Sequence, residues 1–224
     1  MRSRLWAKSD VPVLTGLTPD PHRPGYRILE VDRGRFASLP DEVLRDFPLV
    51  PGMTLEPSSL ERLQHLADIE AAHRAGLRAQ SRRPHASRDL RRRLVLKQHP
   101  PAAVDAAVER LIAQGLIDDR RYAEHYVATR AARGRGPARL LKDLLRQGLD
   151  RRMAEAAVRE TLVAEAIDVE RTLRLVAERR AAGLSGLPVS VKRRRLAAYL
   201  SRRGYYGPGV RRLVEDLVAT GEVT

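Results

Sequence analysis

The side chains best suited to chemistry are concentrated in residues 115–137, which read GLIDDRRYAEHYVATRAARGRGP. Acid–base catalysis or metal binding here would need further carboxylates or histidines converging from elsewhere, and the sequence contains neither an HExxH pattern nor another such motif. Asp118 and Asp119 directly precede a helical run, so we expect them to cap it and to complement the positive end of its dipole. The stretch therefore predicts no catalytic centre and no metal site.

The basic turn RGRGP, which closes this stretch, is not a nucleotide-binding loop. A Walker loop ends in Lys-Ser or Lys-Thr, and a dinucleotide-binding loop follows a strand; neither feature is present. Gly134 and Gly136 are instead expected to end one helix, and Pro137 to start the next. The turn is predicted to join two helical modules.

The aromatic residues of the stretch have a structural interpretation. Tyr122 and Tyr126 lie four residues apart, on one face of a helix, and are expected in the core rather than stacked on bases. His125 lies off that face and is expected to point to solvent. None of the three is predicted to be a ligand or a catalyst.

The charge of the chain is unevenly distributed. Residues 1–80 contain 11 Lys/Arg and 11 Asp/Glu, whereas residues 81–224 contain 31 and 17, so the whole net charge of +14 lies in the second part. Such an excess favours a polyanionic partner, with nucleic acid as the first candidate. The alternative is a solvated surface in which basic side chains pair with acids four residues away.

The basic residues that flank the apolar stripes of the predicted helices are the candidates for contact with nucleic acid or with a protein filament. Phosphate contact requires solvent-facing cations along a track, and aligned helical modules would provide one. The candidates are Arg91, Arg92, Arg93, Lys97, Arg130, Arg133, Arg135, Arg139, Lys142, Arg146, Lys192, Arg193, Arg194, Arg195, Arg202, Arg203, Arg211 and Arg212.

A helix–turn–helix pattern occurs three times after residue 80. The units are offset by 50 and 56 residues, and apolar residues four apart mark one helical face on each side of a short turn. The position after the first helix is expected to adopt the left-handed conformation that caps helices. The matched columns are Leu90, Leu140 and Leu196; Leu94, Leu144 and Leu200; Gln98, Gly148 and Gly204; Val104, Ala154 and Val210; and Val108, Val158 and Val214.

The N-terminal part has a different pattern. Residues 26–36 alternate around a turn at Asp32–Arg35, where Gly34 is expected to take the positive φ of a hairpin. A short helix is predicted after Pro40, and a longer one is predicted from a Ser58 or Ser59 cap to about Ala79.

Together these patterns predict a mainly α protein: an elongated, curved tandem array of three three-helix modules behind a small β-hairpin and helix region. With no cysteine, disulfides and thiolate metal sites are excluded. No apolar run approaches the ~18 residues of a spanning helix, and no signal peptide is evident, so we expect a cytoplasmic protein. The expected divisions are a flexible segment at 1–22, a hairpin region at 23–58, and modules at 59–115, 116–164 and 165–224.

Four motifs, RRPHASRDLRRRL, GLIDDRRYAEHYV, RGRGPARLLKDLLRQGL and RRRLAAYLSRRGYYGPGVRRLV, resemble the RecX family of bacterial recombination regulators. The resemblance runs from about Gly25 to Ala219, and its most specific blocks are LIDDxRYA and RGxGPxRL. The chain departs from the family pattern at Gln98–Pro100, where a glycine-aromatic-acid joint is usual. It also departs at Ala86, where a capping Ser or Thr is common and Ser87 is the expected substitute.

The resemblance implies three tandem three-helix modules and a role in recombination, DNA repair and the SOS response. It implies binding to the RecA recombinase filament on single-stranded DNA, with double-stranded DNA as a second candidate partner, and restraint of ATP hydrolysis, filament growth and strand exchange. We expect a monomer. No cofactor, no metal, no membrane and no catalytic residue are implied.

Two other classes of function compete with this reading. A helix–turn–helix transcription regulator would need one base-reading helix and, in most cases, a dimer that matches a palindromic site. A nucleic-acid enzyme would need a cluster of carboxylates or histidines, which the sequence does not contain.

Overall fold

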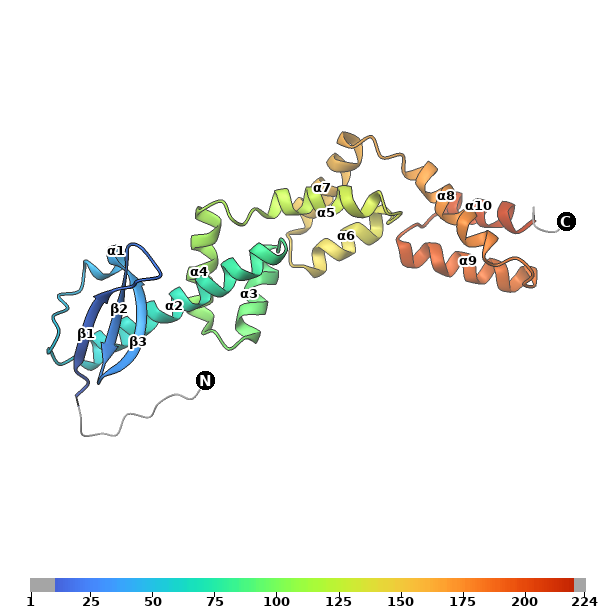
Figure 1. Cartoon of the computed structure of the whole chain (residues 1–224). Coiled ribbons are helices and arrows are strands. Elements are labelled where there is room, and N and C mark those ends of the chain that lie inside the picture. The colour runs from blue at the N-terminus through green and yellow to red at the C-terminus, as the bar shows by residue number, and fades with distance from the viewer. Residues whose placement is uncertain (1–10, 220–224) are drawn as a thin grey trace. The chain divides into compact units, whose positions relative to one another are not determined.

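The computed structural model describes residues 11–219 (Figure 1). These form two compact units. Unit 1 contains residues 11–83 and 90–114, and unit 2 contains residues 84–89 and 115–219. Within this part of the chain, no helix has both the length and the apolar run that crossing a membrane requires.

Unit 1 begins with a three-stranded antiparallel sheet in the order β1-β2-β3. The strands are β1 (Leu14–Pro19), β2 (Tyr26–Val31) and β3 (Gly34–Pro40). We expected a two-stranded hairpin and a flexible segment at 1–22, but β1 lies within that segment and adds a third strand to the sheet. Residues 1–10 of the segment lie outside the described residues. Leu14 is fully buried against the sheet core, which is why β1 is ordered although its sequence has no clear apolar alternation.

The turn between β2 and β3 corrects a second expectation. Asp32 and Arg33 carry the positive φ angles, 51° and 61°, whereas Gly34 is the first residue of β3 and pairs with Val31. This is the two-residue turn whose twist matches that of the strands. The Arg33 N–H donates to the Thr15 hydroxyl over 2.9 Å, so β1 helps hold the conformation.

Two helices follow the sheet, α1 (Asp41–Leu44) and α2 (Pro57–Arg82). Pro57 occupies the first turn of α2 after Glu56, which gives no side-chain cap, so neither Ser58 nor Ser59 caps the helix as expected. Proline can replace a cap there because its missing N–H needs no partner.

Unit 1 is completed by most of α3 (Ser87–Leu96) and by α4 (Pro101–Ala113). The carboxylate of Glu70 in α2 is 4% exposed and pairs with Arg23 at 3.4 Å and Arg110 at 3.3 Å. These ion pairs connect α2 to the β1–β2 loop and to α4.

Unit 2 contains two groups of three helices, each around its own apolar core. The first group is α5 (Asp119–Ala131), α6 (Pro137–Arg146) and α7 (Arg151–Ala164), and the second is α8 (Val169–Ala182), α9 (Val189–Arg203) and α10 (Pro208–Ala219). Leu140 and Leu144 are fully buried in the first core, and Leu196 and Leu200 in the second. The chain is therefore mainly α, with a small sheet followed along the sequence by tandem three-helix modules. The exact module boundaries stay a prediction.

The three helix–turn–helix joints have the predicted geometry. Gln98, Gly148 and Gly204 all adopt positive φ, at 66°, 92° and 89°. The backbone N–H of the residue that follows each of them donates to a leucine carbonyl five residues earlier: His99 to Leu94 (3.2 Å), Leu149 to Leu144 (3.3 Å) and Tyr205 to Leu200 (3.1 Å). This is the hydrogen bond of the Schellman motif. The glutamine in the first unit thus supports the same joint as the two glycines.

Candidate polyanion-binding site

The acids of residues 115–137 position helices rather than gather around a metal. Asp118 caps α5 by accepting from the Arg121 N–H at 2.9 Å, as expected. Asp119 lies in the first turn of α5, as expected of an acid that complements the helix dipole, but instead of capping α5 it accepts from the N–H and the hydroxyl of Ser87, at 2.7 and 2.6 Å, at the start of α3. Ser87 is therefore a donor to Asp119 and not the substitute cap. Across residues 11–219, no group of three or more His, Asp or Glu could hold a metal ion.

The aromatic residues of α5 belong to the core of the first group, as predicted. Tyr122 and Tyr126 pack against this core, and the Tyr126 hydroxyl donates to Asp143 at 3.1 Å. Burial, followed by the nearby Asp143 carboxylate, raises the pKa of Tyr126 above its ordinary value of 10.0. His125 is exposed.

The RGRGP turn joins α5 to α6 as predicted and also touches α9. Gly134 has a φ of 77°, Gly136 is the N-cap of α6, and Pro137 begins that helix. The Gly136 N–H donates to the Arg203 carbonyl at 2.7 Å, and a β-carbon on Gly136 would lie 2.6 Å from the Gly204 carbonyl oxygen. Only glycine allows this approach of two backbones.

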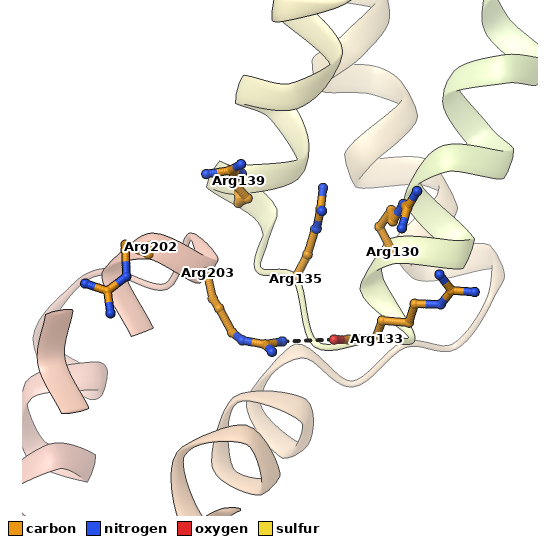
Figure 2. Close-up of a pocket in the computed structure, with 6 residues that line it drawn as sticks. All are labelled: Arg130, Arg133, Arg135, Arg139, Arg202 and Arg203. Atoms are coloured by element: carbon orange, nitrogen blue, oxygen red, sulfur yellow. Dashed lines mark hydrogen bonds between the residues drawn. The ribbon is translucent and has the colours of Figure 1, made fainter. Parts of the chain in front are cut away.

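This contact brings together six arginines around an open cleft of about 290 Å³ in unit 2 (Figure 2). Arg130 comes from α5, Arg133 and Arg135 from the turn, Arg139 from α6, and Arg202 and Arg203 from the end of α9. All the side chains that line the cleft are arginines.

Several of these guanidinium groups are held in place by neighbouring groups. Arg203 reaches across to donate to the Arg133 carbonyl at 2.9 Å (Figure 2) and to the Gly134 carbonyl at 3.1 Å. Arg135 and Arg139 pair with the buried Asp143 at 2.5 and 3.0 Å. Because a guanidinium has five N–H donors, these contacts leave other donors available to a ligand.

Arg133 and Arg202 are different: both are exposed, and within residues 11–219 neither side chain pairs with an acid. Of the six arginines of the cleft, Arg135 and Arg139 pair with the buried Asp143, which also pairs with Arg146 at 3.6 Å. The cleft thus carries a concentrated positive charge that is only partly neutralised, which suits a polyanion.

The cleft contains six of the eighteen predicted basic residues, and none of the eighteen is buried. Arg91, Arg92, Arg93 and Lys97 lie in unit 1, where Arg91 pairs with Asp105 at 3.2 Å and with Glu109. Outside the cleft lie the remaining candidates of unit 2: Lys142, Arg146, Lys192, Arg193, Arg194, Arg195, Arg211 and Arg212.

Sequence reasoning missed the role of Asp143. Its signal was present, because Asp143 follows Arg139 by four residues and so lies on the same face of α6. That it would be buried, and would also hold Arg135, could not be inferred from spacing alone.

The family model described as "RecX, second three-helix domain" matches residues 118–158. A "Regulatory protein RecX" of Pseudomonas savastanoi pv. phaseolicola is 38% identical over 136 residues, covering 60% of this chain and 84% of the relative. The chain belongs to the RecX family. A second RecX, of Halorhodospira halophila, is 35% identical over 146 residues, covering 65% of this chain and 87% of that protein.

Solved structures agree with the RecX fold. A crystal structure of "regulatory protein RecX" is 18% identical and superposes with a TM-score of 0.70, covering 92% of this chain and 99% of the other. The RecX of Lactobacillus salivarius gives a TM-score of 0.53 at 20% identity, over 70% of this chain. At these identities the RecX structures support the fold alone.

Proposed function

We propose that this chain is a non-enzymatic, monomeric, cytoplasmic regulator of the RecA recombinase in DNA repair and recombination. It binds the recombinase filament on single-stranded DNA and restrains ATP hydrolysis, filament growth and strand exchange. The proposal rests on membership of a family whose relatives are named regulatory proteins. The match to one of these relatives covers 84% of its length.

The fold supports this proposal physically. Tandem modules repeat the same joint, so several weak contacts to a polymer of repeating subunits can add together. The surplus of basic residues adds attraction to DNA phosphate or to an acidic protein surface, and predicts that binding weakens as salt increases.

The test is the ATPase activity of the recombinase on single-stranded DNA, measured at low salt with and without this protein. We expect suppression at or below an equimolar ratio. The triple change Arg193→Glu, Arg194→Glu and Arg195→Glu at the start of α9 is expected to weaken it, because these three side chains are exposed. The matched control changes Arg171, Arg174 and Arg179, exposed residues of α8, to glutamate. An unchanged ATPase with folded wild-type protein would remove the proposal.

The second candidate is a helix–turn–helix transcription regulator, which the three equivalent joints favour. Such a protein would prefer one duplex sequence over random duplex by about a thousandfold or more. Binding to a library of random duplexes at fixed salt separates the candidates, because a filament regulator is expected to enrich no sequence.

A further inference from the structure

We propose that the arginine cleft, the cleft lined by Arg130, Arg133, Arg135, Arg139, Arg202 and Arg203, binds the phosphodiester backbone of a single DNA strand without regard to sequence. This inference deepens the proposed function, on which it rests, by assigning this part of the basic surface to DNA rather than to the recombinase.

The chemistry of the lining favours phosphate. All six side chains are arginines, whose planar forks of N–H donors match the oxygens of a phosphate group in pairs. No aromatic ring lines the cleft, so bases have no surface on which to stack. Contacts to phosphates alone carry no sequence information.

The amount of charge favours a strand over an acidic protein surface. Six guanidinium groups line the cleft and one carboxylate, Asp143, pairs with two of them, so several further negative charges are needed to neutralise the cleft. A DNA strand supplies one charge about every 3.4 Å along a continuous chain. Glutamate or aspartate side chains supply one charge each, and each must be ordered separately at a cost in entropy.

The site is organised before any ligand arrives. Arg203 is fixed by two backbone carbonyls and lies 4.9 Å above the Tyr199 ring, while Arg135 and Arg139 are fixed by Asp143. Arginines that are already ordered lose less conformational freedom on binding. Arg133 and Arg202 are the two exposed arginines of the cleft and have no acidic partner within residues 11–219, so their N–H donors are available to the strand.

The experiment measures binding of the full-length protein to a fluorescent oligo-dT by anisotropy, without recombinase and across a series of salt concentrations. The test variant is Arg133→Ala with Arg202→Ala. The control is Arg171→Ala with Arg174→Ala, which removes the same charge from exposed positions of α8 in the same unit. Thermal unfolding followed by circular dichroism checks that both variants are folded.

We expect the test pair to bind about tenfold more weakly and the control pair to change by less than about twofold. The slope of log affinity against log salt should fall by about 1.4 in the test pair, because each lost phosphate contact on a single strand contributes about 0.7. A second variant, Arg133→Lys with Arg202→Lys, keeps the charge but removes the forks, and we expect an intermediate loss of about threefold.

Three outcomes would overturn the assignment. Equal losses in the test and control pairs would mean a general charge effect. Displacement of the oligonucleotide by inorganic pyrophosphate at equal phosphate concentration would mean a site for small phosphates rather than a strand. Normal oligonucleotide binding by the test pair, combined with weaker inhibition of the recombinase ATPase, would mean that the cleft meets the recombinase. If the wild type binds through the cleft but does not inhibit, the inference stands and the proposed function fails.

Discussion

Gly204, at the end of α9, and Arg139, in the first turn of α6, are in direct backbone contact. A β-carbon on Gly204 would lie 2.2 Å from the Arg139 backbone nitrogen, and Gly204 has a φ of 89°. The same glycine therefore does two things: it caps α9 and allows the two three-helix groups of unit 2 to meet. The arginine cleft depends on this contact.

Replacing Gly204 with alanine is expected to lower the free energy of unfolding by about 2–4 kcal/mol, because the methyl group adds strain at positive φ and collides with α6. Urea unfolding measures the change. Gly209→Ala is the control, since a β-carbon there has no atom within 4 Å and Gly209 lies within α10. Equal stability of Gly204→Ala and wild type would contradict the contact.

Asp119 is expected to matter more for stability than its neighbour Asp118. Asp119→Ala removes two charge-assisted hydrogen bonds to Ser87 and should cost about 2–3 kcal/mol, whereas Asp118→Ala removes one helix cap and should cost about 1 kcal/mol. Chemical denaturation of the two variants checks the order. Ser87→Ala should lie between Asp119→Ala and wild type, because it keeps the backbone donor; the reverse order would disprove this account of α3.

Asp143 is expected to affect stability and binding in opposite directions. Asp143→Ala leaves Arg135 and Arg139 without their acid, and we expect a loss of about 2 kcal/mol, since both arginines are still about a third exposed to water. The same change removes the one carboxylate that pairs with arginines of the cleft, and we expect affinity for oligo-dT to rise, because the gain of one net positive charge outweighs the lost ordering of Arg135 and Arg139. Unfolding and anisotropy measurements on one preparation test both parts, and weaker DNA binding by a folded variant would contradict the second.

Tyr126 is expected to make stability depend on alkaline pH. Burial and Asp143 raise its pKa above 10.0 in the folded protein, so folding favours the protonated phenol. The contribution of Tyr126 to folding stability is complete at pH values below the pKa of tyrosine in the unfolded chain. It is lost as the pH rises through the higher pKa of Tyr126 in the folded protein. In Tyr126→Phe, the decline in stability above pH 10.0 should be shallower than in wild type. Ultraviolet titration of tyrosinate should show one fewer late-ionising group.

Much of the helical part could be predicted because its signals are local. The joints at Gln98, Gly148 and Gly204 follow from apolar residues spaced by four and a capping residue between them, all within one or two turns of helix. The N-terminal sheet was predicted less well. β1 and the positive φ of Asp32 and Arg33 depend on pairing with strands that local periodicity does not specify.

The sequence alone determined that this chain is a basic, mainly helical protein built from repeated helix–turn–helix units, because composition, charge and helix capping are properties of short stretches. Only the tertiary structure decided which basic residues act together. Arg133 and Arg203 meet because Gly136 and Gly204 allow two backbones to touch, and Asp119 holds Ser87 because α5 packs beside the start of α3. Such contacts join residues far apart in the chain, and packing rather than spacing selects them.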